Sequence, residues 1–294
     1  MGDVNQMDVS IVLVSYNTKD LTRNCINSIL EKTNGIEFEI FVVDNNSQDG
    51  SAEMIEREFP SVKLIRNFEN KGFGAANNIA IRKSSAKYIL CLNTDTVLVN
   101  NAVKVLFHFM ENNPNTAVAG GILFDENMNP GTSYTPFPTI WNSTSIAWIY
   151  KWLKRKFVKK KETNKVKEVS MIVGADIFFR KSVLDEVGLF DEAFFMYSEE
   201  ADLCLRIKRA GYNIKFVPDA KIIHFGEKSA KSSWNTLEQR VVSRYIYARK
   251  NSPKITLYTM KLSYLILHLV CYIFTFDKNH LNMFKTHYFE KKQV

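Results

Sequence analysis

Apolar runs and segments with helical periodicity alternate along the first 124 residues. Runs typical of buried strands occur at residues 9–15, 38–43, 62–65, 88–91 and 117–124. The segments between them place apolar residues at helical spacing, as on the face formed by Leu21, Cys25, Ile29 and Leu30. This alternation predicts an α/β fold whose mostly parallel central sheet is covered by helices on both faces.

The alternation lapses between residues 125 and 167 and then resumes. Strand patterns recur at residues 171–180, 213–217 and 221–225, and helix patterns at 182–187 and about 232–250. The segment 255–276 is strongly apolar but is interrupted by Lys261 and His268. Because its uninterrupted apolar stretches are short for a membrane span, we expect an interfacial helix pair rather than a crossing.

Polar clusters follow three of the predicted strands, at residues 15–17, 44–51 and 93–96. The carboxyl ends of parallel strands share one edge of a sheet, where α/β folds bind their ligands, so we expect the clusters to meet there. Asp95, with room for several waters, suits Mg²⁺ or Mn²⁺ bridging the phosphates of a nucleotide. The alternative is that these polar residues serve only the hydrogen-bonded geometry of turns.

Two glycines, Gly72 and Gly74, precede a predicted helix that runs to about Ser84. A dinucleotide-binding motif is excluded because the third glycine is absent and the segment follows the third strand rather than the first. The helix N-terminus could still receive a phosphate or a sugar hydroxyl. A plain loop-to-helix junction is the alternative.

Three acidic residues, Glu199, Glu200 and Asp202, open a later predicted helix behind the candidate N-cap Ser198. The helix dipole favours negative charge in a first turn, which is a structural reason for all three. Adjacent carboxylates also raise each other's pKa, which can tune a general base toward neutrality. Both interpretations remain open, as they do for His224 near a strand end, which is either a packed residue or a ligand.

The net charge of +8 over 294 residues indicates an anionic partner, either nucleotide, nucleic acid or a membrane surface. Residues 151–167 carry nine Lys or Arg against one Glu. Such a basic segment with interleaved aromatics suits a membrane surface, and single-stranded nucleic acid or a solvated loop are the alternatives. The aromatic residues in and just before this segment are Trp141, Trp148, Tyr150, Trp152 and Phe157.

The four cysteines are dispersed and form no CxxC pair, which indicates reduced thiols in a cytosolic protein and argues against a structural zinc site. Residues 1–8 are polar, and the apolar run at 9–14 is too short for a secretory signal. An apolar content of 46% with 24% charged residues is that of an ordinary globular protein.

Taken in order, these motifs resemble the inverting family-2 glycosyltransferases with a GT-A fold, especially their bacterial rhamnosyltransferase-like branch. The resemblance covers residues 9–230 and leaves out 125–167 and 250–294. It implies a GT-A-type, Rossmann-like sheet. The apolar tail, which lies outside the resemblance, predicts a C-terminal helical extension that associates with a membrane. The stretches that carry the resemblance are 14–17, 42–51, 70–77, 92–96, 188–202, 206–212 and 224–229.

The resemblance implies a role for each matched residue. Asp44 and the loop 15–17 would hold the nucleoside of a sugar nucleotide, and Lys71, Gly72 and Asn77 would line its phosphate and sugar side. Asn93-Thr94-Asp95 stands where the family has its DxD motif, so only one carboxylate remains there and weaker metal binding is expected. The donor-binding set implied is Ser15, Tyr16, Asn17, Asp44, Asn46, Lys71, Gly72, Asn77, Asn93, Thr94 and Asp95.

The resemblance also implies the catalytic and metal sites. Asp95 and His224 would bind the divalent cation, Mg²⁺ or Mn²⁺. Glu200 matches the catalytic base, with Glu199 and Asp202 beside it. The family usually has Asp at this position, so the choice between Glu199 and Glu200 stays open.

We therefore expect a metal-dependent inverting hexosyltransferase that moves rhamnose or another hexose from a nucleotide sugar to a saccharide acceptor of a cell-surface polysaccharide such as O-antigen. The basic insert and apolar tail predict a lipid-linked acceptor and a peripheral position on the cytoplasmic membrane face, without a nucleic-acid partner. The alternatives are a nucleotidyltransferase on a similar sheet and a non-catalytic single-stranded nucleic-acid-binding protein. The predicted parts are a domain at 1–230, divided into a nucleotide-binding half (1–124), an insert (125–167) and an acceptor half (168–230), and a helical membrane-proximal region at 231–294.

Overall fold

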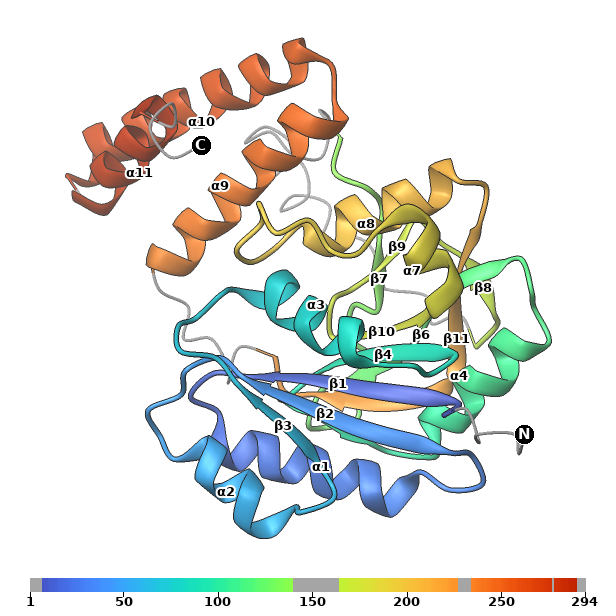
Figure 1. The fold of residues 1–294 in the computed structure, drawn as a ribbon. Helices are drawn as coiled ribbons and strands as arrows, with labels where there is room; N and C mark the ends of the chain where they lie inside the picture. The colour runs from blue at the N-terminus through green and yellow to red at the C-terminus, as the bar shows by residue number, and fades with distance from the viewer. Residues whose placement is uncertain (1–6, 140–163, 227–233, 277, 290–294) are drawn as a thin grey trace.

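The computed structural model describes residues 7–139, 164–226, 234–276 and 278–289. In this part of the chain, nine strands form one sheet in the order β3-β2-β1-β4-β10-β6-β11-β5, with β8 beside β11 (Figure 1). Its strands are β1 (Val9–Ser15), β2 (Phe38–Asp44), β3 (Lys63–Arg66), β4 (Tyr88–Asn93), β5 (Thr96–Leu98), β6 (Thr116–Phe124), β8 (Lys167–Glu168), β10 (Asp176–Arg180) and β11 (Asn213–His224). A separate pair is formed by β7 (Tyr134–Thr135) and β9 (Met171–Ile172).

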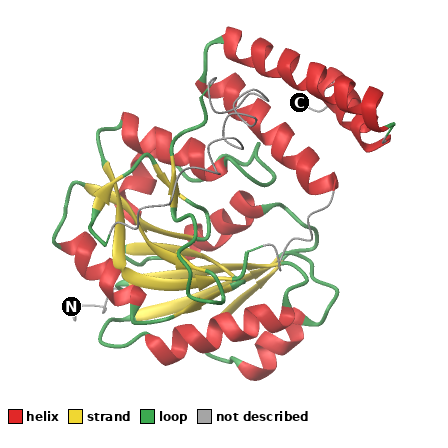
Figure 2. Ribbon diagram, turned by 180° about the vertical axis from the view of Figure 1, so that it is seen from behind, coloured by secondary structure: helices red, strands yellow, loops and turns green. Residues whose placement is uncertain are grey.

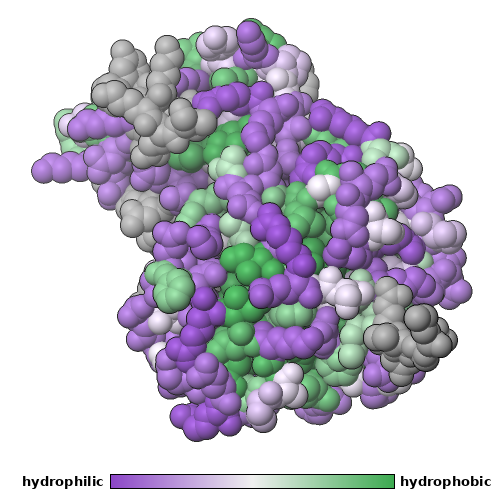
Figure 3. Space-filling model, in the orientation of Figure 1, coloured by the Kyte–Doolittle hydropathy of each residue, from purple (hydrophilic) through white to green (hydrophobic). Residues whose placement is uncertain are grey.

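Helices cover both faces of the sheet and enclose two apolar cores (Figure 2). The core on one face includes α1, α2 and α4, and the core on the other includes α3, α7 and α8. Hydrophilic residues cover most of the outer face in the view of Figure 1, with a band of apolar residues down its middle (Figure 3). The helices of this body are α1 (Lys19–Lys32), α2 (Ser51–Glu58), α3 (Phe73–Lys83), α4 (Ala102–Glu111), α7 (Lys181–Val187) and α8 (Glu199–Arg209).

The first four strands of the sheet are parallel, as the sequence predicts. Register pairs Ser15 with Asp44 and Val14 with Asn93, so the carboxyl ends of β1, β2 and β4 lie at one edge. The second half of the sheet is mixed because β10 runs antiparallel between β4 and β6, and β11 is parallel to β6 but antiparallel to β5. The chain re-enters the sheet in this half, at β8 and β10, after the long segment that follows residue 124.

Several predicted elements differ from the structure. The two strands expected at 213–217 and 221–225 are one strand, β11, in which Pro218 falls within a register shift between Phe216 and Lys221. A bulge absorbs the residue that lacks an N–H, so the strand continues. The strand expected at 171–180 is instead divided into β9 and β10 around Gly174.

One side-chain prediction about a helix was wrong, and a second was confirmed in the position of the residue but without the expected hydrogen bond. Leu30 of α1 is exposed, and Ile26 is buried in the core together with Cys25 and Ile29. Ser198 does precede α8, but its backbone is left-handed and its hydroxyl makes no capping hydrogen bond. The hydroxyl of an N-cap reaches the helix only from the extended backbone that such residues usually adopt.

Three C-terminal helices, α9 (Trp234–Asn251), α10 (Lys254–Thr275) and α11 (Lys278–Phe289), form a small apolar cluster of their own. Helix α9 packs on α8, whereas α10 and α11 lie away from the sheet (Figure 1). The helix pair expected within 255–276 is a single 22-residue helix, α10, because Lys261 and His268 do not interrupt it. By length and composition alone, this helix could cross a membrane.

Candidate active site

A cleft of about 390 Å³ opens at the carboxyl edge of β1 and β4. The loop 173–175, the start of α8, the end of β11 and one side of α9 form its other walls. The predicted residues that line it are Tyr16, Gly72, Asn93, Thr94, Asp95, Glu199, Glu200 and His224. Stretches that are far apart in the sequence therefore meet in one cleft.

Asp95 and His224 are brought together by strand pairing. His224 pairs with Thr96 across β11 and β5, and the Phe225 N–H donates to the carbonyl of Asp95 at 2.9 Å. The His224 Nε2 consequently lies 3.3 Å from Oδ1 of Asp95. Asp95 is buried, about a quarter of the His224 side chain is exposed, and both residues line the cleft.

The spacing of this pair fits two ligands of one divalent cation. Adjacent ligands at about 2.1 Å from a metal ion, roughly at right angles, lie about 3 Å apart. In the described residues no cluster of three or more His, Cys, Asp or Glu could hold a metal on its own. Mg²⁺ and Mn²⁺ sites that bind nucleotides commonly use one or two protein ligands and complete the shell with waters and phosphate oxygens, so the residues present fit such an ion.

Glu199 and Glu200 face the same cleft from the first turn of α8. Glu199 is buried and Glu200 is partly exposed, and Oε2 of each makes no hydrogen bond to any described residue. Burial raises the pKa of the Glu199 carboxyl well above its ordinary value, and the charge of Glu200 adds to the rise. Burial also raises the pKa of Glu200, against the opposing effect of backbone N–H groups at the start of α8. A carboxyl with such a pKa is suited to accept a proton near neutral pH.

The backbone before these glutamates is tightly constrained. Tyr197 and Ser198 have φ of 71° and 68°, a left-handed conformation that non-glycine residues rarely adopt in succession. Gly72 lies against the same loop: its φ is 81°, and a Cβ atom there would come within 2.1 Å of the Phe195 carbonyl. The Phe73 N–H donates to that carbonyl at 2.8 Å. Gly72 is therefore required for the close approach of the α3 N-terminus to the loop that carries Glu199.

The loops after β1 and β2 form a second, connected group beside the cleft. The Asn17 N–H donates to Ser47 Oγ at 3.0 Å, and Gln48 N–H donates to Asn17 Oδ1 at 2.7 Å. Asp44 accepts from the Ser47 N–H, and its Oδ1 is buried without a hydrogen-bond partner among the described residues. A buried oxygen without a hydrogen-bond partner can accept a hydrogen bond from a ligand.

Other predicted residues are held by the protein itself. Ser15 is buried in a hydroxyl cluster with Thr18 and Thr22. Asn46, with a left-handed backbone, accepts from the side chain of Gln48. None of Ser15, Asn17, Asp44 or Asn46 lines the cleft directly.

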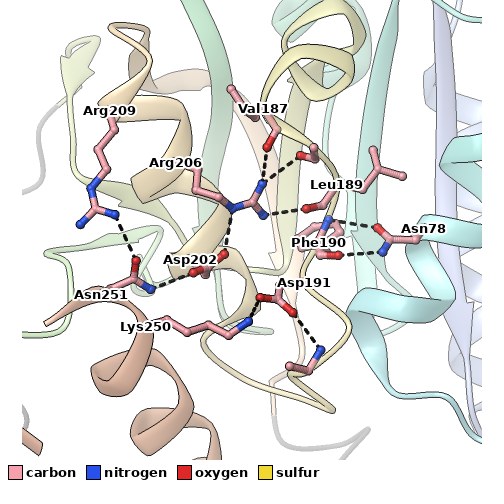
Figure 4. Close-up of polar contacts among 12 residues, drawn as sticks. Asn78, Val187, Leu189, Phe190, Asp191, Asp202, Arg206, Arg209, Lys250 and Asn251 are labelled. Carbon is pink, nitrogen blue, oxygen red and sulfur yellow. Dashed lines mark hydrogen bonds and ion pairs between the residues drawn. The ribbon is translucent and has the colours of Figure 1, made fainter.

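Three further predicted residues do not line the cleft. Lys71 pairs with Glu69 at 2.8 Å, and the Asn77 amide donates to the Phe73 carbonyl at 3.0 Å. Asp202 pairs with Arg206 at 2.9 Å and accepts from Asn251 at 2.8 Å (Figure 4). Arg206 in turn donates to carbonyls of the 187–189 loop. Asp202 therefore stabilises the packing of α8 on this loop and does not line the cleft.

Sequence reasoning missed several residues of the cleft wall. Asn45 donates to Asn70 Oδ1 and to the Gly72 carbonyl and accepts from Asn67 and Lys71, which fixes the loop before α3. The position of Asn45 in the polar run 44–51 could have indicated that it belongs to the site. Arg240 of α9 also lines the cleft, and no motif in its surroundings points to a site.

The sheet, its carboxyl-edge cleft and the facing Asp95–His224 and Glu199–Glu200 pairs define a GT-A-type transferase architecture. The sequence pattern described as "Glycosyl transferase family 2" matches residues 10–188, and the chain belongs to this family. It is therefore a glycosyltransferase.

Three curated relatives are similar over much of the chain. A low-salt glycan biosynthesis hexosyltransferase, Agl10 of Haloferax volcanii, is 26% identical over 70% of this chain and 64% of its own length. The dTDP-rhamnosyl transferase RfbF of Shigella flexneri is 25% identical over 95% of this chain and 93% of its own. An N-acetylglucosaminyl-diphospho-decaprenol L-rhamnosyltransferase of Mycobacterium tuberculosis is 23% identical over 63% of this chain and 66% of its own.

A solved structure supports the fold. GalNAc-T7, crystallised with UDP, GalNAc and Mn²⁺, superposes with a TM-score of 0.61 at 17% identity. The match covers 84% of this chain and 51% of that one. The expectation of a GT-A fold is thereby confirmed.

Proposed function

We propose that this glycosyltransferase moves a sugar, rhamnose or another hexose, from a nucleoside-diphosphate sugar to a saccharide acceptor of a cell-surface polysaccharide. The observation that carries the proposal is the single cleft in which the Asp95–His224 pair faces Glu199 and Glu200. The first pair suits the cation of a diphosphate, and the second suits proton transfer. The names of the relatives from Shigella and Mycobacterium favour rhamnose as the sugar.

The donor would lie along the carboxyl edge of β1, β2 and β4. The buried Asp44 oxygen and the loop 15–17 would hold the nucleoside, with Asn46, Lys71 and Asn77 nearby. Tyr16, Gly72 and residues 93–95 line the cleft toward the phosphates. Asp95 and His224 would hold Mg²⁺ or Mn²⁺, which when bound neutralises the charge of the departing diphosphate.

Glu200 is proposed as the general base. Both glutamates line the cleft, and Glu200 is the less buried of the two, which is why the acceptor hydroxyl is assigned to it. The Glu200 carboxylate takes the hydroxyl proton as the acceptor oxygen bonds to the anomeric carbon. The bond from that carbon to the diphosphate oxygen breaks on the opposite face, and its electron pair leaves with the nucleoside diphosphate. Attack opposite the leaving group inverts the configuration through an oxocarbenium-like state.

The acceptor is proposed to be lipid-linked, with the enzyme peripheral on the cytoplasmic membrane face. Helix α10 supports this because an exposed apolar stripe runs along it at helical spacing. The Mycobacterium relative is named for a diphospho-decaprenol acceptor. The basic aromatic segment at 141–161, which also led to this expectation, lies outside the described residues. The members of the α10 stripe include Ile255, Tyr258, Leu262, Ile266, Leu269 and Ile273.

The direct test is a panel of dTDP-, UDP- and GDP-sugars with Mn²⁺ and the full-length chain. Thermal shift should select one nucleotide, and that donor should release its nucleoside diphosphate when an acceptor saccharide is supplied. Release of pyrophosphate instead would identify a nucleotidyltransferase. Failure of every donor to bind would contradict the proposal.

A further inference from the structure

Helix α9 contributes a cation to the cleft although it lies beyond the segment that resembles the family. Arg240 lines the cleft, as Thr236 and Leu237 do from the same helix. Three carboxylates, those of Asp95, Glu199 and Glu200, line this cleft. Among its described lining residues, Arg240 is the only Lys or Arg. The charge of Arg240 adds to that of the divalent cation proposed at Asp95 and His224 in attracting an anionic ligand to this acidic lining.

The guanidinium of Arg240 is held by an aromatic ring rather than by an acid. Its Cζ lies 4.7 Å from the centroid of the Tyr197 ring, within cation–π range. No hydrogen bond or ion pair joins Arg240 to any described residue, and the residue lines the cleft. Arginine presents its N–H donors as a planar fork that matches phosphate oxygens, and stacking on a ring leaves the edge of the fork available.

The ring beneath Arg240 belongs to the left-handed turn that precedes the catalytic glutamates. Helix α9 contacts this turn a second time, where Ser243 Oγ donates to the Met196 carbonyl at 2.6 Å. At the far end of α9, Asn251 donates to Asp202 and Lys250 pairs with Asp191 (Figure 4). Helix α9 is thus fixed on the catalytic body at its middle and at its C-terminal end, and the position of Arg240 beside the cleft is fixed with it.

We propose that Arg240 is a diphosphate-binding residue of the active site, supplied by the C-terminal helices and oriented by Tyr197. This inference rests on the proposed sugar transfer and adds a residue to it. The diphosphate has two sources with the same chemistry, the nucleotide sugar and the lipid-linked acceptor. In both cases the guanidinium donates to phosphate oxygens at the side of the cleft opposite Asp95.

The test compares Arg240→Gln with Arg244→Gln. Arg244 is one turn further along α9, exposed, and bonded to Tyr264 of α10, so the control removes the same charge from the same helix outside the cleft. Calorimetry on the full chain with Mn²⁺ uses dTDP and UDP as probes of the donor diphosphate and farnesyl diphosphate as the probe of the acceptor diphosphate. We expect Arg240→Gln to weaken at least one of them about tenfold or more, and Arg244→Gln to stay within about twofold, because charge-assisted bidentate contacts are the strong ones.

The pattern across probes identifies the source. Loss with dTDP or UDP alone assigns the donor, and loss with farnesyl diphosphate alone assigns the acceptor. Arg240→Lys, which keeps the charge, should recover part of the lost affinity. If Arg240→Gln binds all three probes as the wild type does, even with reduced turnover, Arg240 only stabilises the turn and the inference is overturned. If the wild type itself binds no probe and consumes no donor, the proposed function fails first.

Discussion

His224, the last residue of β11, lies with its Nε2 3.3 Å from Oδ1 of Asp95 in the turn after β4. No local signal in the sequence joins the two residues. Their contact depends on β5, a three-residue strand that follows Asp95 and pairs antiparallel with the end of β11. The arrangement is rigid because Asp95 is buried and its backbone carbonyl accepts a hydrogen bond from Phe225.

The first prediction concerns this pair as a cation site. His224→Ala removes one of the two proposed protein ligands, so the Mn²⁺ concentration needed for donor binding should rise about tenfold or more. Asp95→Asn should have a larger effect because it removes the only carboxylate among the two. Titration of Mn²⁺ against nucleotide affinity measures both. His108→Ala, which changes an exposed histidine of α4, should leave the titration unchanged.

The second prediction separates the two glutamates. Glu200→Gln should lower the transfer rate about 10² to 10⁴-fold while donor affinity stays near wild type, because only the proton acceptor is lost. Single-turnover kinetics with the donor identified by the panel measure the step. Glu199→Gln should retain more activity, since Glu199 is the more buried of the two residues. The reverse order of the two variants would assign the base to Glu199.

The third prediction follows from the raised pKa of Glu199. A carboxyl whose folded-state pKa lies above its unfolded value binds more protons in the folded protein, so stability falls as pH rises between these two values. Glu199→Gln removes this penalty and should raise the thermal midpoint at pH 7, by about 2–4 °C for each kcal/mol recovered. Below about pH 4, where the carboxyl is protonated in both states, the gain should vanish. Melting curves across pH measure it, and an equal gain at pH 4 and pH 7 would contradict the assigned cause.

Much of the N-terminal half could be predicted because local patterns decide it. The buried runs of β1, β2 and β4 and the polar residues at their carboxyl ends are encoded within a few residues each. Parallel pairing then places them at one edge without further information. The glutamate pair was found in the same way, from its position at the opening of α8.

What escaped prediction depends on contacts between distant segments. Asp202 lies in the same acidic first turn as Glu200. Its carboxylate nevertheless pairs with Arg206 and Asn251 and so joins α8 to α9. Lys71 matches a family motif but pairs with Glu69. Arg240 lacks any motif, and only the packing of α9 on α8 brings it to the cleft. The domain boundary proposed at residue 230 stays a prediction, and it falls between two helices that pack on each other, α8 and α9.

The fourth prediction tests the close approach at Gly72. Gly72→Ala combines a left-handed φ of 81° with a Cβ contact of 2.1 Å to the Phe195 carbonyl, so the two loops must move apart. Gly211→Ala is the matched control because its φ is 93° but a Cβ atom there meets nothing within 4 Å. The control should lose about 1–2 kcal/mol of unfolding free energy from backbone strain alone, and Gly72→Ala should lose more. Chemical denaturation measures both, and equal losses would show that the contact is relieved without cost.

The last prediction concerns the exposed face of α10. Leu262 and Ile266 are each more than half exposed, one turn apart, on a helix with few buried residues. The double variant Leu262→Asp/Ile266→Asp places two charges where acyl chains would be, so recovery of the full-length protein with floated vesicles of anionic phospholipid should fall severalfold. Leu30→Asp, on the exposed face of α1, is the control for an added charge and should float like the wild type. Transfer to a soluble acceptor should persist in the double variant, because these side chains do not line the cleft. Unchanged flotation of the double variant would remove α10 from the membrane-binding surface and leave the sugar-transfer site unaffected.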